Sequence, residues 1–312
     1  MLRIPILAVI VSLFLVARSD AADKLTVLLD WFVNPDHGPL VVAEVGGYFE
    51  RAGLDVELIA PADPSAPPKL VAAGQADVAI SYQPDMMLNL EEGLPLVRFG
   101  TLVETPLNSL VVLKDGPVKT LSDLKGKRVG YSVAGFEDVY VAVLLKSVGL
   151  EPADVTLISV NFNLTGSLLA GQVDAVIGAF RNFELTQLAL EGAEGFAFFP
   201  EENGVPPYDE LIYVTHAEKK DDPRLGRFLA AVEDATIFLT NHPEAALDMF
   251  IRAHPDLDDE LNRRAWFDTL PRFAKRPAAI DQRRYDRFGA FLKDEGLIDE
   301  VPPFDSYNVM LR

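Results

Sequence analysis

Residues 69–93 read KLVAAGQADVAISYQPDMMLNLEEG, and this stretch sets the pattern for most of the chain. Lys69–Ala73 is predicted to form a helix that ends at Gly74, because glycine is common directly after the last helical turn. Val78–Tyr82 is apolar and partly β-branched, which predicts a buried strand. Asp85–Glu92 is predicted to form a second helix. Helices and strands that alternate in this way are typical of α/β domains.

The same alternation extends through the first two-thirds of the sequence and then changes. Further strands are expected at Leu25–Leu29, Val56–Ile59, Val97–Glu104, Leu110–Leu113, Arg128–Ser132, Val155–Val160 and Ala175–Ala179. Helices are expected between them, at Gly38–Ala52, Glu137–Ser147, Thr165–Ala170 and Phe183–Glu191. From Pro223 onward the pattern is helical, and these helices are expected to pack back on the first part of the chain. Repeated βαβ units predict mostly parallel sheets.

The 312 residues are more than one ordinary core accommodates, so we expect two lobes. The chain is predicted to cross between them near Val103–Leu110 and again near Pro206–Val214. Lobe 1 would then comprise residues 23–105 and 214–312, and lobe 2 residues 106–213. Two extended strands that join two rigid lobes can act as a hinge.

The first residues are typical of a secretory signal peptide. Arg3 precedes the apolar run Ile4–Val16, and Ser19 and Ala21 supply the small residues of a cleavage site. The run is short for a membrane span, although a retained anchor is the alternative. We predict that residues 1–22 are removed and that the protein is periplasmic. Because no cysteine is available for lipid attachment, we expect no lipid anchor.

Composition excludes several classes of function. The chain has no cysteine, which rules out thiol catalysis and thiolate metal sites. Its formal net charge of −19 argues against nucleic acid and anionic membrane surfaces as partners. We therefore expect no metal, no cofactor and no nucleic-acid partner.

The ligand of an open α/β sheet lies beyond the carboxyl ends of its strands. Five segments have such positions: Asp30–His37, Ser81–Pro84, Ser132–Glu137, Asn161–Thr165 and Ala179–Glu184. The first two belong to lobe 1 and the other three to lobe 2. A ligand among them would contact both lobes, so that its binding would favour the closed form.

These five segments combine aromatic rings with amide and carboxylate groups. They contain Trp31, Phe32, Tyr82, Phe136, Phe162, Phe180 and Phe183, with Asn34, His37, Gln83, Asn161, Asn163, Asn182 and Glu184, and Arg181 as the single cation. Stacking on an aromatic side chain contributes about 1–3 kcal/mol to the binding of one nucleic-acid base. A carboxylate accepts hydrogen bonds from an exocyclic amine. The segments predict a flat, neutral or weakly basic heterocycle as ligand, since a small anion would need more donors.

Several of these residues have a simpler structural interpretation. Trp31 and Tyr82 can be core residues at strand ends, and Phe162 is expected in the core because it alternates with polar neighbours. Glu184 begins a helix, where a carboxylate is stabilised by the helix dipole. His37 can cap the first helix.

The cleft segments resemble those of the thiamine-pyrimidine binding proteins, which are periplasmic solute-binding proteins of ABC transporters. Residues 29–37, LDWFVNPDH, resemble the signature D-W-x-x-N-x-x-H of that family. Its later helices and strands are similar to residues 46–49, 53–57, 74–83 and 168–179. The resemblance covers about Leu25 to Val214. It implies the two-lobed periplasmic binding protein fold of type II.

The resemblance also implies a ligand, partners and a site. The ligand would be formylaminopyrimidine or hydroxymethylpyrimidine, delivered to an inner-membrane ABC permease and its ATPase. Glu184, at a helix start, corresponds to the glutamate on the amino side of the pyrimidine. The loop before that glutamate is often rich in Trp or Tyr, whereas here residues 180–184 read FRNFE. The implied ligand-binding residues are Trp31, Asn34, His37, Tyr82, Phe136, Phe180 and Glu184.

Three other functions are compatible with the same fold. One is ligand sensing as the partner of a membrane receptor, and a second is binding of a sulfonate, riboflavin or another aromatic solute. The third is enzymatic, because the fold family includes fungal enzymes that make the pyrimidine from pyridoxal phosphate and a histidine, here His37. Such an enzyme would need a cofactor lysine and a cysteine-rich metal segment, and this chain has no cysteine. We therefore expect a binding protein and not an enzyme.

Overall fold

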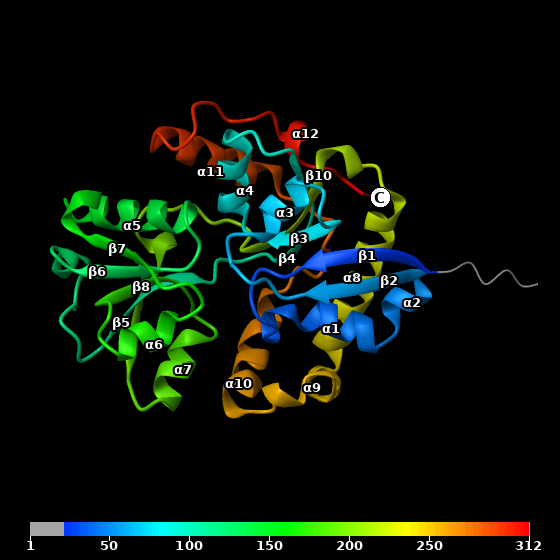
Figure 1. Ribbon diagram of the computed structural model, residues 1–312, viewed down its shortest axis with the longest axis horizontal. Coiled ribbons are helices and arrows are strands. Elements are labelled where there is room, and N and C mark those ends of the chain that lie inside the picture. Colours follow the sequence, from blue (N-terminus) through cyan, green and yellow to red (C-terminus); the bar gives the residue numbers. More distant parts are fainter. Residues whose placement is uncertain (1–21, 312) are drawn as a thin grey trace, which may run out of the picture.

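The computed structural model describes residues 22–311, so the predicted signal peptide lies outside the described residues except for its last position. Two five-stranded sheets, each flanked by helices, form two lobes that lie next to each other (Figure 1). The predicted two-lobed α/β fold is confirmed. Within residues 22–311, no helix has both the length and the apolar character that a membrane crossing requires.

The first lobe is built on a sheet with the strand order β2-β1-β3-β10-β4. β1 is parallel to β2 and β3, whereas β10 is antiparallel to both β3 and β4. Four of the five strands therefore run in one direction, as expected. The strands are β1 (Asp23–Leu28), β2 (Leu54–Ile59), β3 (Val78–Ser81), β4 (Leu96–Val103) and β10 (Leu211–His216).

Helices from both ends of the chain cover this sheet. The C-terminal helices pack on the first lobe as predicted, with α8 and α9 against α1. The helix expected at 38–52 is two helices, because Gly47 adopts a left-handed conformation (φ +68°) that ends the first one. The helices are α1 (Gly38–Val45), α2 (Tyr48–Arg51), α3 (Pro67–Ala72), α4 (Gln83–Glu91), α8 (Pro223–Asn241), α9 (Pro243–Ala253), α10 (Glu260–Thr269), α11 (Gln282–Asp294) and α12 (Phe304–Tyr307).

The second lobe has the strand order β7-β6-β8-β5-β9. β6 is parallel to β7 and β8, and β5 is antiparallel to β8 and β9. The edge strand β9 was not among the predicted strands, because it begins at Gly195, three residues after Gly192, and closely spaced glycines are typical of a loop. The elements are β5 (Asn108–Leu113), β6 (Arg128–Tyr131), β7 (Thr156–Ser159), β8 (Ala175–Phe180), β9 (Gly195–Phe198), α5 (Phe136–Ser147), α6 (Leu164–Leu169) and α7 (Glu184–Leu190).

The chain crosses between the lobes twice, at residues 104–107 and 199–210. The two strands that follow a crossing, β5 and β10, are the antiparallel strands of their sheets. The boundary expected between 213 and 214 lies inside β10, since Leu211 already pairs with Val103 of the first sheet. No glycine or proline separates the crossing from β10 after Pro207, so the sequence gives no signal for its start.

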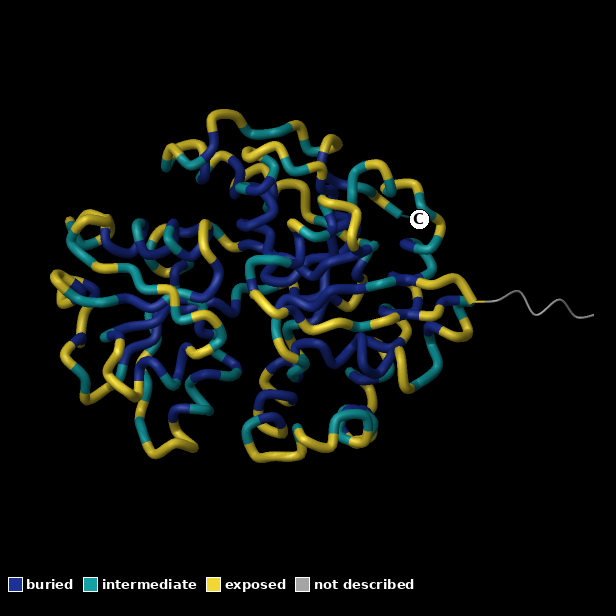
Figure 2. The backbone as a smooth tube through the Cα atoms, in the orientation of Figure 1, coloured by how far each residue is buried: buried dark blue, intermediate teal, exposed yellow. Residues whose placement is uncertain are grey.

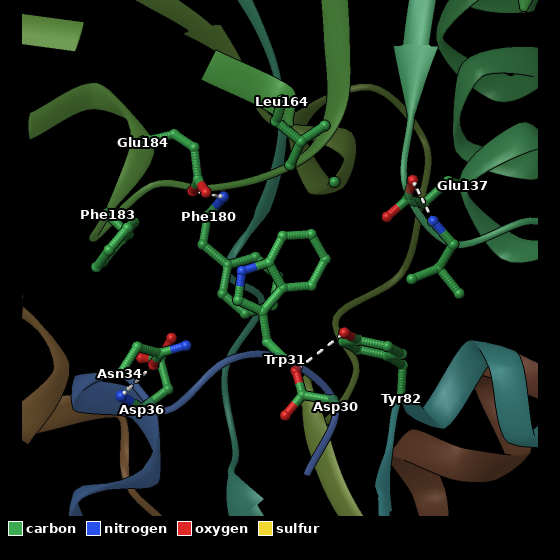
Figure 3. Close-up of a pocket in the computed structure, with 12 residues that line it drawn as sticks. Asp30, Trp31, Asn34, Asp36, Tyr82, Glu137, Leu164, Phe180, Phe183 and Glu184 are labelled. Carbon is green, nitrogen blue, oxygen red and sulfur yellow. Dashed lines mark hydrogen bonds between the residues drawn. The ribbon is translucent and has the colours of Figure 1, made fainter. Parts of the chain in front are cut away.

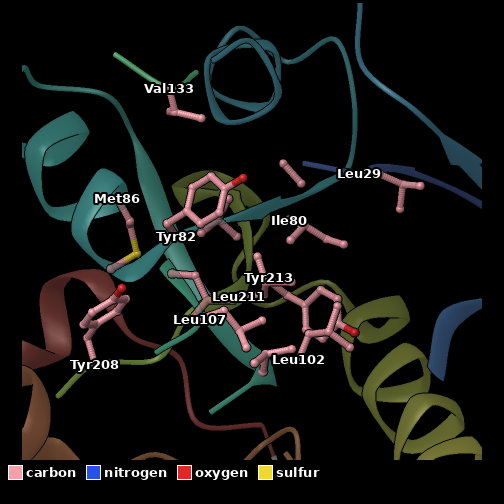
Figure 4. Close-up of a cluster of buried hydrophobic side chains, with 14 of the residues drawn as sticks. Leu29, Ile80, Tyr82, Met86, Leu102, Leu107, Val133, Tyr208, Leu211 and Tyr213 are labelled. Carbon is pink, nitrogen blue, oxygen red and sulfur yellow. The ribbon is translucent and has the colours of Figure 1, made fainter. Parts of the chain in front are cut away.

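Buried side chains continue from one lobe to the other. Figure 2 shows buried segments in both sheets and at the junction of the lobes. Figure 4 shows one such cluster, in which Leu107 of the first crossing lies among residues of lobe 1, and Val133 of lobe 2 lies near Tyr82. The hydrophobic core thus includes residues of the hinge, and this packing holds the two crossing segments in place.

A buried carboxyl group also ties the two crossings together. Oε2 of Glu210, in the second crossing, accepts hydrogen bonds from the backbone amides of Leu107 (2.5 Å) and Asn108 (2.9 Å) and from the Tyr208 hydroxyl (3.0 Å). Burial raises the pKa of Glu210 to about 7, although these hydrogen bonds oppose the increase. Glu210 therefore couples two hinge segments that are about a hundred residues apart in sequence.

We predict that Glu210→Ala lowers the free energy of unfolding by about 3 kcal/mol, because it leaves two buried amides without an acceptor. Glu194→Ala is the control, since Glu194 pairs with Lys114 on the exposed surface and such pairs contribute about 0–1 kcal/mol. Urea unfolding measures both changes. Equal effects of the two substitutions would show that Glu210 does not hold the hinge.

Candidate ligand-binding site

A cavity lies between the lobes, where strands of both sheets end. The space that protein atoms leave empty here is about 450 Å³, and this volume includes the part that is open to solvent. Its walls come from the loops after β1, β3, β6 and β8 and from the start of α6, which are the segments predicted to face the cleft (Figure 3). The lining residues are Asp30, Trp31, Asn34, Asp36, Tyr82, Val133, Glu137, Leu164, Gly178, Phe180, Phe183 and Glu184.

Five of the seven residues proposed from the sequence line this cavity: Trp31, Asn34, Tyr82, Phe180 and Glu184. His37 and Phe136 do not line it, and both are buried. Arg181, the single cation of the cleft segments, points to the hinge instead, where it pairs with Glu201 and donates to the Leu107 carbonyl. The cavity is thus aromatic and acidic.

His37 holds an acidic side chain of the cavity wall in place. Its Nδ1 accepts the backbone N–H of Asn34 (3.2 Å), so the proton of the neutral ring is on Nε2, which donates to Oδ1 of Asp30 (3.0 Å). The hydroxyl of Tyr82 donates to the other oxygen, Oδ2, at 2.9 Å. Asp30 therefore has both oxygens fixed, one by His37 behind it and one by Tyr82 beside it.

Aromatic contacts cross the cleft at two places. The ring of Phe136, from lobe 2, packs 4.9 Å from that of Tyr82 in lobe 1, which places Phe136 behind the cavity wall. At the other place Phe162 lies edge-on to Trp31, with ring centroids 4.6 Å apart. Phe162 was expected in the core, but it is half-buried at the cleft, because the loop after β7 turns it toward lobe 1.

A polar contact also joins the lobes beside the cavity. Nδ2 of Asn182, after β8, donates to Oδ1 of Asp36 and to the Thr269 hydroxyl, both at 2.7 Å. Burial raises the pKa of Asp36 to about 6, despite the hydrogen bonds from Asn182 and Thr269. These hydrogen bonds connect a loop of lobe 2 to two separate segments of lobe 1.

Glu184 is the first residue of α7 and lies at one end of the cavity (Figure 3). Its Oε2 accepts the backbone N–H of Phe180 at 2.6 Å. Burial, with a smaller contribution from the nearby Asp36 carboxyl, raises its pKa to about 8. A carboxyl group that only caps a helix does not need to be buried. The burial of Glu184 costs free energy, and a ligand with hydrogen-bond donors can offset this cost.

Three acidic residues of the wall were not among the proposed site residues: Asp30, Asp36 and Glu137. All three occur in the segments predicted to face the cleft. Their place after the strand ends was therefore the sequence feature that could have identified these three residues. Nothing in the sequence indicated which side chains of a segment point into the cavity. Among the lining residues, all of them within the described part of the chain, there is no Lys, Arg or His.

The described residues contain no group of three or more potential ligands placed to hold a metal ion. The cavity instead offers aromatic faces from Trp31, Tyr82, Phe180 and Phe183, with carboxyl groups around them. Two α/β lobes that are joined by two crossings and contact each other around such a cavity define the fold of the periplasmic binding proteins.

Comparisons with known proteins identify the family. A model of the family described as NMT1/THI5 like matches residues 34–246, which are more than half of the chain, and the protein belongs to this family. It is 50% identical over 304 residues to a Haemophilus influenzae protein that is named for thiamine biosynthesis, covering 97% of each chain. It is 33% identical over 236 residues to the formylaminopyrimidine-binding protein of Halalkalibacterium halodurans, covering 74% of this chain and 71% of the relative.

Other relatives carry enzyme names. The 4-amino-5-hydroxymethyl-2-methylpyrimidine phosphate synthase of Legionella pneumophila is 27% identical over 288 residues, with 91% of this chain and 90% of the relative covered. Among solved structures, the alkanesulfonate-binding protein SsuA of Xanthomonas axonopodis superposes with a TM-score of 0.71 at 15% identity, over 92% of this chain and 96% of that one. At this identity the structural match shows the fold alone.

The raised pKa of Glu184 gives a prediction about stability. Folded protein keeps a proton on Glu184 up to about pH 8, whereas the unfolded chain releases it near its ordinary pKa of about 4.3. Unfolding is therefore favoured increasingly as the pH rises between these values. Glu184→Gln removes this dependence, so the ligand-free variant should gain about 4 kcal/mol relative to wild type between about pH 5 and pH 9.

Thermal unfolding of both proteins across this pH range measures the difference. Glu191→Gln, the same substitution at the exposed other end of α7, is the control and should follow the wild-type curve. If the curves of Glu184→Gln and wild type stay parallel, Glu184 is not a buried proton-binding group.

Proposed function

We propose that this protein binds an aminopyrimidine precursor of thiamine in the cavity and delivers it to an ABC importer. The precursor is formylaminopyrimidine or hydroxymethylpyrimidine, and the partners are an inner-membrane permease and its ATPase. The protein acts in the periplasm after its signal peptide is removed. The observation that carries this proposal is a buried glutamate, Glu184, at the end of an aromatic cavity without cations.

The hydrogen bonds of Glu184 favour an amino group as its partner. Oε2 is engaged by the Phe180 amide, so Oε1 is the atom left for the ligand, and it accepts a hydrogen bond from an exocyclic amine once the carboxyl group has released its proton on binding. The ring of the ligand would lie against Trp31 and Phe180, which line the cavity between its two ends (Figure 3). Partly exposed aromatic faces in such a position favour a flat ring over an aliphatic solute.

A sulfonate fits this cavity less well. A sulfonate is a permanent anion, and its recognition needs cations or several aligned donors. The lining residues, which all belong to the described chain, include four acidic residues and no basic one. Burying a negative charge among them would be strongly unfavourable. The formylaminopyrimidine-binding relative supports the pyrimidine instead.

We further propose that the protein is not a pyrimidine synthase. Both ring nitrogens of His37 are engaged, one by the Asn34 amide and one by Asp30, and the ring does not line the cavity. His37 then serves to position Asp30. Intact mass after incubation with pyridoxal phosphate tests this role, because a synthase reaction that consumes His37 would change the mass of the chain.

Two substitutions test the binding site by calorimetry with hydroxymethylpyrimidine and formylaminopyrimidine. Glu184→Gln should weaken binding by about 1–3 kcal/mol. The glutamine oxygen must accept the Phe180 amide, so the glutamine NH2 group faces the amino group of the ligand. Trp31→Ala should weaken binding by a similar amount, because it removes a stacking face.

Glu191→Gln and Phe196→Ala are the matched controls, since both side chains are exposed and away from the cavity. They should keep the wild-type affinity. Binding of an alkanesulfonate or riboflavin by the wild type, with no binding of either pyrimidine, would reject the proposed ligand.

A further inference from the structure

Glu137 fills a site at the start of α5 that is otherwise suited to an anion. Its Oε2 accepts hydrogen bonds from the backbone amides of Ser132 (2.7 Å) and Val133 (3.1 Å), in the loop between β6 and α5. The side chain is buried, and it lines the cavity at the end opposite Glu184 (Figure 3). Two adjacent amides directed at one point before a helix form a typical anion-binding arrangement.

The neighbouring strand is built to leave room for this carboxyl group. Gly178 in β8 has φ +90°, and a Cβ atom there would lie 2.3 Å from Oε1 of Glu137. Any larger residue at 178 would push Glu137 off the amides. Glu137 and Gly178 both line the cavity. The Glu137 carboxyl group thus lies where the phosphate of a ligand could otherwise accept hydrogen bonds from the backbone amides of Ser132 and Val133.

The rest of the wall gives no alternative site for a phosphate. Burial raises the pKa of Glu137 well above its ordinary value. The cause is loss of solvation, which makes a negative charge in this part of the cavity unfavourable. The other acidic residues of the wall are Asp30, Asp36 and Glu184, and no basic side chain of the described chain lines it. A phosphate dianion would therefore be desolvated without a compensating partner.

We propose that Glu137 is a specificity-determining residue that occupies the amides of Ser132 and Val133 and thereby excludes phosphorylated pyrimidines from the cavity. The protein then takes the free pyrimidine and rejects its phosphate ester. This inference rests on the proposed function for the identity of the ring. The occupation of the amides can be tested separately with inorganic phosphate.

The experiment compares hydroxymethylpyrimidine with its phosphate ester by calorimetry in wild type and three variants. Wild type should prefer the free pyrimidine by about a hundredfold or more, as expected when a charged group is buried unpaired. Glu137→Ala frees both amides and should reduce this preference at least about tenfold, because charge-assisted hydrogen bonds to the phosphate form. Glu137→Gln keeps an oxygen on the amides and should retain the wild-type preference.

Asp138→Ala is the matched control. Asp138 is the next residue of α5, but it does not line the cavity and does not contact the two amides. Its loss should change the preference far less than Glu137→Ala does, because Asp138 acts on Glu137 only through its charge. An unchanged preference in Glu137→Ala, or an equal reduction in Glu137→Ala and Glu137→Gln, would overturn the proposal.

Inorganic phosphate provides the second readout, because Glu137→Ala loses a buried contact and can unfold more easily. Phosphate should raise the Tm of this variant and leave that of wild type unchanged, compared with chloride at equal ionic strength. Failure of phosphate to stabilise the variant would also overturn the proposal. If no pyrimidine binds the wild type but phosphate stabilises Glu137→Ala, the proposed function fails and the role of Glu137 stands.

Discussion

The hydrogen bonds that Glu210 accepts from the backbone amides of Leu107 and Asn108 join the two segments that connect the lobes. Because each lobe is entered through a strand that runs against its neighbours, β5 in one sheet and β10 in the other, the parallel strands of both sheets end at the same cleft. The loops that follow these ends are the walls of the cavity. The position of the cavity is thus a consequence of how the chain crosses between the lobes.

The cavity concentrates carboxyl groups where water is scarce. The pKa values of Asp36 and Glu184 are raised, to about 6 and about 8, mainly by burial. This arrangement reduces the stability of the ligand-free protein at neutral pH, since each group must either keep a proton or be charged in a poor solvent. A ligand that brings donors to these groups recovers part of this energy. Under the proposed function, such a site gives up stability for specificity, with a preference for amino groups over anions.

Much of the fold could be predicted from the sequence because it depends on local patterns. The strands of residues 25–180 and the glycines that end the helices gave the α/β order, and the strand ends gave the segments that contain Trp31, Tyr82 and Glu184. The remaining features depend on contacts between distant residues. Asn182 binds Asp36, 146 residues away, and Glu210 binds Leu107, 103 residues away. No local pattern predicts such pairs, or that His37 lies behind Asp30 instead of in the cavity.

A crystal structure of the complex with hydroxymethylpyrimidine tests the account most directly. We expect the ring between the lobes against Trp31, with its amino nitrogen about 2.7–3.2 Å from Oε1 of Glu184. We expect Glu137 to remain on the amides of Ser132 and Val133. A ring bound outside this cavity, or an amino group directed away from Glu184, would contradict the account.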